Sequence, residues 1–244
     1  DSFLEDVLLG LGNNPKTLSP KYFYDEAGSE LFAKICSLEE YYPTKTEIGI
    51  LREYSREIAK VIGSGSILIE YGAGSLDKVR ILLDALSSLV AFVPIDISHS
   101  WLMAAADNLR QSYPDLVIQP VVGDFSQSVE LPELPSPDAR RIAFFPGSTI
   151  GNFNPGPAKN FLTSVAKTVG PGGGLLIGVD LQKDVSTLIG AYDDAAGITA
   201  QFNKNILMRI NRELGGDFNL ERFSHKIRYN VDSARIEMHL KSLT

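Results

Sequence analysis

The stretch Ser66–Ser75, SILIEYGAGS, decides the fold that the sequence predicts. Residues Ile67–Glu70 have the pattern of a buried strand and lead directly into a glycine-rich turn, and the helix-like run DKVRILLDAL begins at Asp77. Glycines allow the backbone to approach a ligand closely, and the next helix presents free N–H groups, so this order is typical of a nucleotide-binding strand–turn–helix. The turn departs from the full G-x-G-x-x-G spacing, because GAGSLD carries no third glycine.

Acidic residues end the next two strand-like runs. Asp96 ends AFVPID, 24 residues after Gly72, close to the spacing of about 20 residues at which an acid reaches a ribose hydroxyl. Asp124 and Phe125 end the following run, VIQPVVGDF. The carboxyl ends of parallel strands meet at one rim, where ligands bind. Acids at this rim without a basic residue in the turn favour an adenosyl ligand, so S-adenosylmethionine is the expected cofactor and an NAD enzyme is the alternative.

The composition argues against several classes of partner. The chain has 244 residues, 44% hydrophobic and 22% charged, as in an ordinary globular protein. A net charge of −7 with scattered Lys and Arg residues argues against nucleic acid. No apolar run approaches the roughly 20 residues that span a bilayer, and no secretory signal opens the sequence, so we expect a cytoplasmic protein without a membrane partner. Because the sequence begins without methionine, we expect a longer gene product.

Cysteine and histidine chemistry is not indicated. The single cysteine, Cys36, excludes an internal disulfide and a cysteine-based zinc site, and its apolar surroundings in LFAKIC predict a core position. His99, His225 and His239 stand in different predicted elements without metal-ligand spacing, so no metal site is expected. We expect His99 at the solvated start of a helix.

Strands alternate with helices from Ile67 to about Asp180. The expected strands are 67–71, 91–96, 117–122, 142–146 and 174–180, and the expected helices are 77–87, 99–112 and 155–169. This alternation predicts an α/β fold with a doubly wound, mainly parallel, Rossmann-like sheet. The predicted domains are a helical lead-in at 1–55 that forms part of a substrate-binding cap, a cofactor-binding core at 56–185, and the rest of the substrate-binding domain at 186–244, with a hairpin around 231–234.

The lead-in carries helix signals. Residues 1–14 predict a short amphipathic helix that closes at a glycine and two asparagines. Ser29 and Thr44 are candidate helix caps, and Glu47 follows Thr44 by three residues, as in a capping box.

The segment IAFFPGSTIGNFNPGP, at 142–157, is the most unusual part of the chain. Asn152 at the rim has a physical role in methyl transfer to nitrogen, because its carbonyl oxygen accepts a hydrogen bond from an amine and aims the lone pair at the methyl carbon. The alternative is that Asn152 caps the helix starting near Pro155. Several tyrosines either wall a small-ligand pocket or simply pack with their hydroxyls at the surface: Tyr22, Tyr24, Tyr41, Tyr42 and Tyr192.

Six segments together resemble one known family: KYFYDEAGSELFAKICSLEEYYPTKTE, IEYGAGSLDKVR, PIDIS, GDF, FFPGSTIGNF and AYDDAAGITAQFNKNIL. They are similar to the histidine-specific methyltransferases of ergothioneine biosynthesis, and the resemblance covers nearly all of the chain. It implies an enzyme that uses S-adenosylmethionine to trimethylate the α-amine of L-histidine, giving hercynine. GSTIGN and YYPTKTE are far more specific signals than the glycine turn.

The resemblance also implies roles for individual residues. The cofactor residues would be Gly72, Gly74, Lys78, Asp96, Asp124 and Phe125, with Asp96 at the ribose and Asp124 and Phe125 at the adenine. Tyr41 and Asn152 would bind the amino-acid head group, Tyr192 would lie near its carboxylate, and Tyr24 would lie close to the reacting amine. Asn152, Tyr41 and Tyr24 are therefore the catalytic candidates.

The chain departs from the family pattern in two places. Gly72–Ser75 reads GAGS where GSGT is common, a change that should preserve backbone binding. Family members continue well past Thr244 with residues that recognise the imidazole, so we expect a truncated chain whose fifth strand has an unpaired edge. The alternatives are methylation of another aromatic amino acid or a tryptophan derivative, and a cofactor-binding fragment without catalysis.

Overall fold

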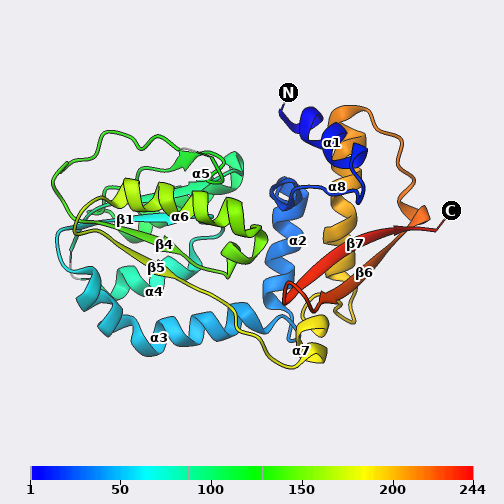
Figure 1. The fold of residues 1–244 in the computed structure, drawn as a ribbon. Helices are drawn as coiled ribbons and strands as arrows, with labels where there is room; N and C mark the ends of the chain where they lie inside the picture. The colour runs from blue at the N-terminus through cyan, green and yellow to red at the C-terminus, as the bar shows by residue number, and fades with distance from the viewer. Residues whose placement is uncertain (1, 87, 128, 244) are drawn as a thin grey trace. The chain divides into compact units, whose positions relative to one another are not determined.

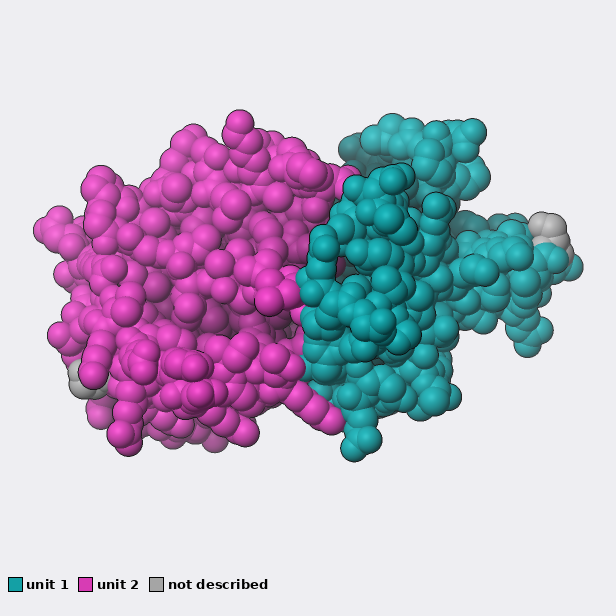
Figure 2. All heavy atoms as spheres, turned by 60° about the horizontal axis from the view of Figure 1, so that its bottom comes forward, with its two compact units in different colours: residues 1–42, 182–244 teal, residues 43–181 magenta. Residues whose placement is uncertain are grey.

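The computed structural model describes residues 2–86, 88–127 and 129–243, and the chain divides into two units (Figures 1 and 2). Unit 1 consists of residues 1–42 and 182–244, and unit 2 consists of residues 43–181. The division of the chain into domains at 55/56 and 185/186 stays a prediction.

Unit 2 is built on a parallel sheet. Its elements are α3 (Tyr42–Ile62, whose first residue belongs to unit 1), β1 (Ser66–Tyr71), α4 (Asp77–Ala85), β2 (Leu89–Asp96), α5 (His99–Ser112), β3 (Val121–Val122), β4 (Arg141–Phe145), the 3-10 helix η2 (Thr149–Asn152), α6 (Pro155–Val169) and β5 (Gly174–Ile177). The five strands are ordered β3-β2-β1-β4-β5, and every pairing is parallel. The predicted doubly wound α/β fold is therefore confirmed, and the strand order reverses between β1 and β4, where such folds bind ligands.

Helices cover both faces of this sheet (Figure 1). Leu68 and Phe92 point to one face and pack with residues of α3, α4 and α5, whereas Ile67 and Ile69 point to the other face and pack with α6. β1 is buried along its whole length. A strand covered on both sides is apolar at nearly every position, which explains why SILI reads as a continuous run.

Two strands are shorter than the sequence predicts. β3 is reduced to two residues, and Ile118 only bridges to Phe92. Gln119 and Gly123 donate their N–H groups to the carbonyls of Phe92 and Asp96, but Pro94, between those two residues of β2, has no N–H to donate in return. β5 ends at Ile177, and farther on the N–H of Asp180 donates to Ser148 Oγ at 2.9 Å instead of to a strand. Helices α5 and α6 begin and end where the sequence predicts, and His99 is exposed at the start of α5.

Unit 1 combines helices with a two-stranded sheet. Its elements are α1 (Ser2–Gly12), η1 (Pro20–Phe23), α2 (Glu26–Ser37), α7 (Val185–Gly190), α8 (Ile198–Leu214), η3 (Leu220–Arg222), β6 (Phe223–Asn230) and β7 (Arg235–Ser242). Strands β6 and β7 are antiparallel, as the predicted hairpin requires. Gly215 ends α8 with a φ of 70°, a left-handed conformation that favours glycine.

The predicted helix caps in the lead-in are wrong. Ser29 lies inside α2, and Thr44 is the third residue of α3. The N-cap of α2 is Asp25, whose Oδ1 accepts the Gly28 N–H at 2.7 Å. Cys36 is partly buried against the aromatic core of unit 1, close to its predicted environment. None of the helices in the described ranges is long and apolar enough to cross a membrane.

Candidate functional site

The glycine turn after β1 is held by bonds within the chain. The N–H groups of Gly72 and Ala73 both donate to the carbonyl of Ile95, at 2.9 and 3.1 Å, and the N–H of Gly74 donates to Asp96 Oδ2 at 3.0 Å. Gly72 and Gly74 have φ values of 71° and 55°. A pyrophosphate needs such amides free to bind it. The turn is therefore poorly suited to NAD, the alternative cofactor.

Leu76 completes the turn in an unusual conformation. Its φ of 62° lies in the left-handed region, where residues with a side chain are uncommon. Its side chain is only 1% exposed and belongs to the core between the sheet and helices α3, α4 and α5. Leu76 thus occupies the place where a glycine would be expected, and the core holds it there.

Asp96, at the end of β2, has capacity to accept further hydrogen bonds. Oδ2 accepts from Gly74, and Oδ1 accepts the Ser98 N–H at 2.9 Å. Each carboxylate oxygen has a second lone pair. Burial raises the pKa of Asp96, and the backbone N–H groups only partly oppose this effect. Neutral hydroxyl groups, such as those of a ribose, are suitable donors to this carboxyl.

Asp124 and Phe125 lie at the same rim. The N–H of Gly123 donates to the carbonyl of Asp96 at 2.9 Å, which joins the ends of β3 and β2. A Cβ added to Gly72 would lie 3.3 Å from Phe125 Cε1. The Asp124 side chain accepts the Ser126 N–H at 2.9 Å. The structure therefore brings Gly72, Gly74, Asp96, Asp124 and Phe125 together, as expected from parallel strand ends.

Glu70 is a residue that the sequence reasoning missed. It lies in β1, is 1% exposed, and its Oε2 has no hydrogen-bond partner among the described residues. Burial raises its pKa well above the usual value, opposed by the charge of Lys78. An acid inside an otherwise apolar central strand was the available signal. An orphaned acceptor beside the switch point fits a ligand rich in donors, and S-adenosylmethionine carries two hydroxyls and an ammonium group.

Lys78, on the first turn of α4, is held by Glu47 of α3. Its Nζ lies 2.6 Å from Glu47 Oε2. The Glu47 carboxylate also accepts the N–H of Gly147, the residue that leads from β4 into the GSTIGN loop, at 2.8 and 2.9 Å from its two oxygens. Lys78 therefore lies at the base of this loop as well as on the helix after the glycine turn.

Asn152 is not a helix cap. It is the last residue of η2 and is exposed, and Asn154 occupies the N-cap position of α6, so the capping alternative is wrong. The loop before it is bent at Gly147 and Ser148, with φ values of 80° and 55°. A serine in the left-handed region is uncommon, and such conformations occur frequently at functional sites.

The other three candidates gather in unit 1. The Tyr41 and Tyr192 rings meet edge to face with centroids 5.9 Å apart, and Phe32 links Tyr41 to Tyr24 at 6.2 and 5.4 Å. Tyr41 is 7% exposed, and burial, followed by the neighbouring Tyr192 and Tyr24, raises its pKa well above the usual 10.0. Tyr22 belongs to a different cluster, where its hydroxyl donates to Asp6 at 2.5 Å.

A buried histidine supports Tyr192. Asn203 Nδ2 donates to the His239 carbonyl at 3.0 Å and lies 2.8 Å from His225 Nδ1. The carbonyl contact fixes the amide orientation, so Nδ1 is the acceptor and Nε2 carries the proton. Nε2 donates to the Tyr192 carbonyl at 2.9 Å. His225 was not a candidate in the sequence analysis, because its partners are 22 and 33 residues away.

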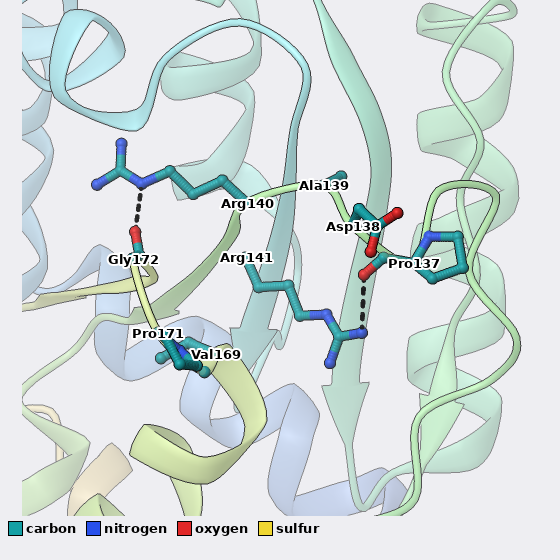
Figure 3. A pocket seen from close by; sticks show the side chains of 9 residues that line it. Pro137, Asp138, Ala139, Arg140, Arg141, Val169, Pro171 and Gly172 are labelled. Carbon is teal, nitrogen blue, oxygen red and sulfur yellow. Dashed lines mark hydrogen bonds between the residues drawn. The ribbon is translucent and has the colours of Figure 1, made fainter.

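A surface pocket lies at the amino ends of β4 and β5, away from the rim described above (Figure 3). Arg140 donates to the carbonyl of Gly172, and Arg141 donates to those of Pro137 and Thr168. These guanidinium groups are engaged by backbone carbonyls, so their role at this pocket is to hold the surrounding backbone together. Across the described ranges there is no cluster of His, Cys, Asp and Glu side chains that would hold a metal ion.

Comparisons with known proteins point to one family. Residues 3–244 match the family described as "Histidine-specific methyltransferase, SAM-dependent". A histidine N-alpha-methyltransferase of Mycobacterium tuberculosis is 48% identical over 97% of this chain and 74% of its own length, and that of Mycolicibacterium smegmatis is 45% identical over 100% and 76%. Ergothioneine biosynthesis protein 1 of Neurospora crassa is 34% identical over 83% of this chain and 24% of its own length. The chain belongs to the family of histidine-specific, S-adenosylmethionine-dependent methyltransferases.

Proposed function

We propose that this chain is an L-histidine Nα-methyltransferase that uses S-adenosylmethionine to form trimethylhistidine, hercynine, in ergothioneine biosynthesis. The observation that carries the proposal is that the family match spans residues 3–244, so it includes both the glycine turn and the aromatic cluster. A free amino acid and S-adenosylmethionine are both cytoplasmic metabolites, so the proposed reaction belongs in the cytoplasm. The net charge of −7 supports a small-molecule substrate rather than nucleic acid.

Residues of unit 2 hold the cofactor in this proposal. S-adenosylmethionine supplies a methyl group on a cationic sulfonium, which needs no proton donor to leave. Asp96 would accept hydrogen bonds from the ribose hydroxyls, and Phe125 and Asp124 would contact the adenine. A Cβ on Gly74 would meet nothing within 4 Å, so the backbone there is open to a close approach, whereas the Phe125 ring fills the space beside Gly72.

The substrate residues orient the α-amine. The amide oxygen of Asn152 accepts a hydrogen bond from the amine and aims its lone pair, and orientation of this kind is a large part of the catalysis available to an in-line displacement. Tyr41 stays a neutral phenol around neutral pH, because burial raises its pKa. It therefore positions the amine by hydrogen bonding and does not remove a proton as a phenolate. The amino nitrogen loses one proton before each of the three transfers, which frees its lone pair, and these protons pass to water.

A competition assay tests the proposal. The protein is incubated with S-adenosylmethionine and an equimolar pool of the twenty amino acids, and the methylated products are followed by mass spectrometry. We expect mono-, di- and trimethylated histidine and no other methylated amino acid. Methylation of tryptophan or another amino acid would overturn the substrate assignment. Cofactor binding by calorimetry without any methylated product would instead favour a cofactor-binding chain without catalysis.

A further inference from the structure

We propose that Glu47 is a positioning residue that couples the cofactor turn to the substrate loop, by fixing Lys78 and the Gly147 backbone with one carboxylate. The part of this inference that concerns histidine binding rests on the proposed function. The feature is a single side chain on α3, outside the strand–turn–helix segments that form the rim. Only 16% of the Glu47 side chain and 22% of the Lys78 side chain are exposed.

The first contact fixes the loop that carries Asn152. Both Glu47 oxygens accept the Gly147 N–H, at 2.8 and 2.9 Å. The next residue, Ser148, is left-handed, and the 3-10 helix that ends at Asn152 begins directly after it. A charged acceptor at the entrance of this bend stabilises a conformation that the local sequence does not favour by itself. Losing the acceptor allows the bend to relax and moves the Asn152 amide.

The second contact fixes a cation at the cofactor turn. Lys78 has a long flexible side chain, and the 2.6 Å ion pair with Glu47 holds its ammonium group in one place. A Cβ added to Gly147 would lie 3.2 Å from that ammonium nitrogen, so the lysine also packs against the loop backbone. Lys78, Glu47 and Gly147 therefore form one three-way contact, which we call the Glu47 clamp.

The chain also leaves space for this carboxylate. A Cβ added to Gly178, just after β5, would overlap Glu47 Oε1. Gly178 has an ordinary φ, so backbone conformation does not require a glycine there. The space occupied by the carboxylate is a sufficient reason. Four separated segments, α3, α4, the loop after β4 and the end of β5, thus converge on Glu47.

Two substitutions separate the contacts of the Glu47 clamp. Glu47→Gln keeps an oxygen that accepts the Gly147 N–H but removes the charge that holds Lys78. Glu47→Ala removes both contacts. Glu57→Gln, on the exposed face of the same helix, is the matched control. For each variant we would measure the Kd of S-adenosylhomocysteine by calorimetry, KM for histidine, kcat and Tm.

We expect Glu47→Gln to raise the Kd of S-adenosylhomocysteine about tenfold, because one charge-assisted contact is lost. KM for histidine should change less than about threefold. Glu47→Ala should raise both constants about tenfold or more. In a Lys78→Met background, Glu47→Gln should cause no further change in Kd, because the charge has lost its partner. Glu57→Gln should match the wild type.

Other patterns overturn the inference. If Glu47→Ala leaves both constants near the wild-type values, Glu47 does not position either group. The same conclusion follows if both variants lose Tm and active fraction while Kd and KM change by the same factor in each. Additive effects of Glu47→Gln and Lys78→Met would refute the coupling through Lys78. The calorimetric measurements need no turnover, so a wild type that fails to methylate histidine would refute the proposed function while the Kd series still decides the role of Glu47.

Discussion

Replacement of Asp25 by alanine should destabilise unit 1 by about 3 kcal/mol. The Asp25 carboxylate accepts from the Gly28 N–H and Asn205 Nδ2, both at 2.7 Å, and from Arg212 Nη2 at 2.6 Å. It thereby caps α2 and ties it to α8. Residues 23 and 24, directly before Asp25, belong to the aromatic cluster that contains the tyrosine candidates.

The magnitude follows from the three partners of Asp25. Loss of an N-cap costs about 1 kcal/mol. Asn205 is 1% exposed, and its Oδ1 already has no hydrogen-bond partner among the residues that the structure describes, so stranding its Nδ2 group costs a further 1–3 kcal/mol or so. The Arg212 side chain is 49% exposed, so screening by solvent limits its part to below about 1 kcal/mol. Asp25→Asn keeps an acceptor for α2 and loses mainly the charge, so we expect a cost of about 1 kcal/mol.

The effect of the charge depends on pH. Burial alone would raise the pKa of Asp25, but hydrogen bonds from Arg212, Gly28 and Asn205 outweigh it, so the pKa lies below its usual 3.8. A lowered folded-state pKa means that the stabilisation is fully present above the unfolded-state pKa, about 3.9, and disappears as the pH falls through the folded-state value. The difference between the wild type and Asp25→Asn should therefore shrink below about pH 4.

Urea unfolding followed by far-ultraviolet circular dichroism measures these free energies at neutral pH and near pH 3. Amide hydrogen exchange along α2 and α8 localises the loss to unit 1. An Asp25→Ala variant within about 0.5 kcal/mol of the wild type would refute the reasoning, because it would mean that the buried Asn205 amide needs no acceptor. A difference between the wild type and Asp25→Asn that persists unchanged at acid pH would refute the assignment of the charge effect.

Three further predictions concern the reaction. Asn152→Ala should raise KM for histidine at least about tenfold and leave the Kd of the cofactor, measured by calorimetry, unchanged. The control Asn160→Ala, at an exposed position of α6, should change neither constant. Weaker cofactor binding by Asn152→Ala would contradict the assignment. His225→Leu removes the donor to the Tyr192 carbonyl, so it should raise KM for histidine severalfold and leave the Kd of the cofactor unchanged. Equal changes in both constants would contradict a role through Tyr192. Tyr41→Phe should give a pH–rate profile parallel to that of the wild type below about pH 9, because the pKa of Tyr41 is raised. If an ionisation seen in the wild-type profile in this range disappears in the variant, Tyr41 does titrate there and the prediction is wrong.

Local sequence patterns predicted the elements that local forces determine. The strand before the glycine turn and the bounds of α5 and α6 follow from hydrophobic periodicity and from the flanking turn residues. The shortening of β3 was visible in principle, because Pro94 in the neighbouring predicted strand has no N–H to donate. The residue types alone left all five tyrosines open between a pocket and a packing role. Only the family resemblance singled out Tyr24, Tyr41 and Tyr192, since no periodicity relates them.

Contacts between distant residues account for much of what the sequence did not reveal. Thr44 and Glu47 read as a capping box, yet Glu47 binds a backbone N–H 100 positions away. The cap bond from the Gly28 N–H to Asp25 is local and could have been predicted, but the contacts of Asp25 with Asn205 and Arg212, 180 and 187 positions away, could not. A one-dimensional pattern contains nothing that relates such pairs. Polar residues in the lead-in therefore have roles that only the tertiary structure reveals.

The left-handed Leu76 has a consequence for protein engineering. A non-glycine residue in this conformation carries a strain of roughly 1 kcal/mol, which full burial of a leucine side chain, at about 2 kcal/mol, exceeds. The shape of the glycine turn thus depends on core packing in unit 2 as well as on its own hydrogen bonds, and it cannot be redesigned by changing the turn alone. Enlarging the turn to admit bulkier cofactor analogues will require matching substitutions among the core neighbours of Leu76.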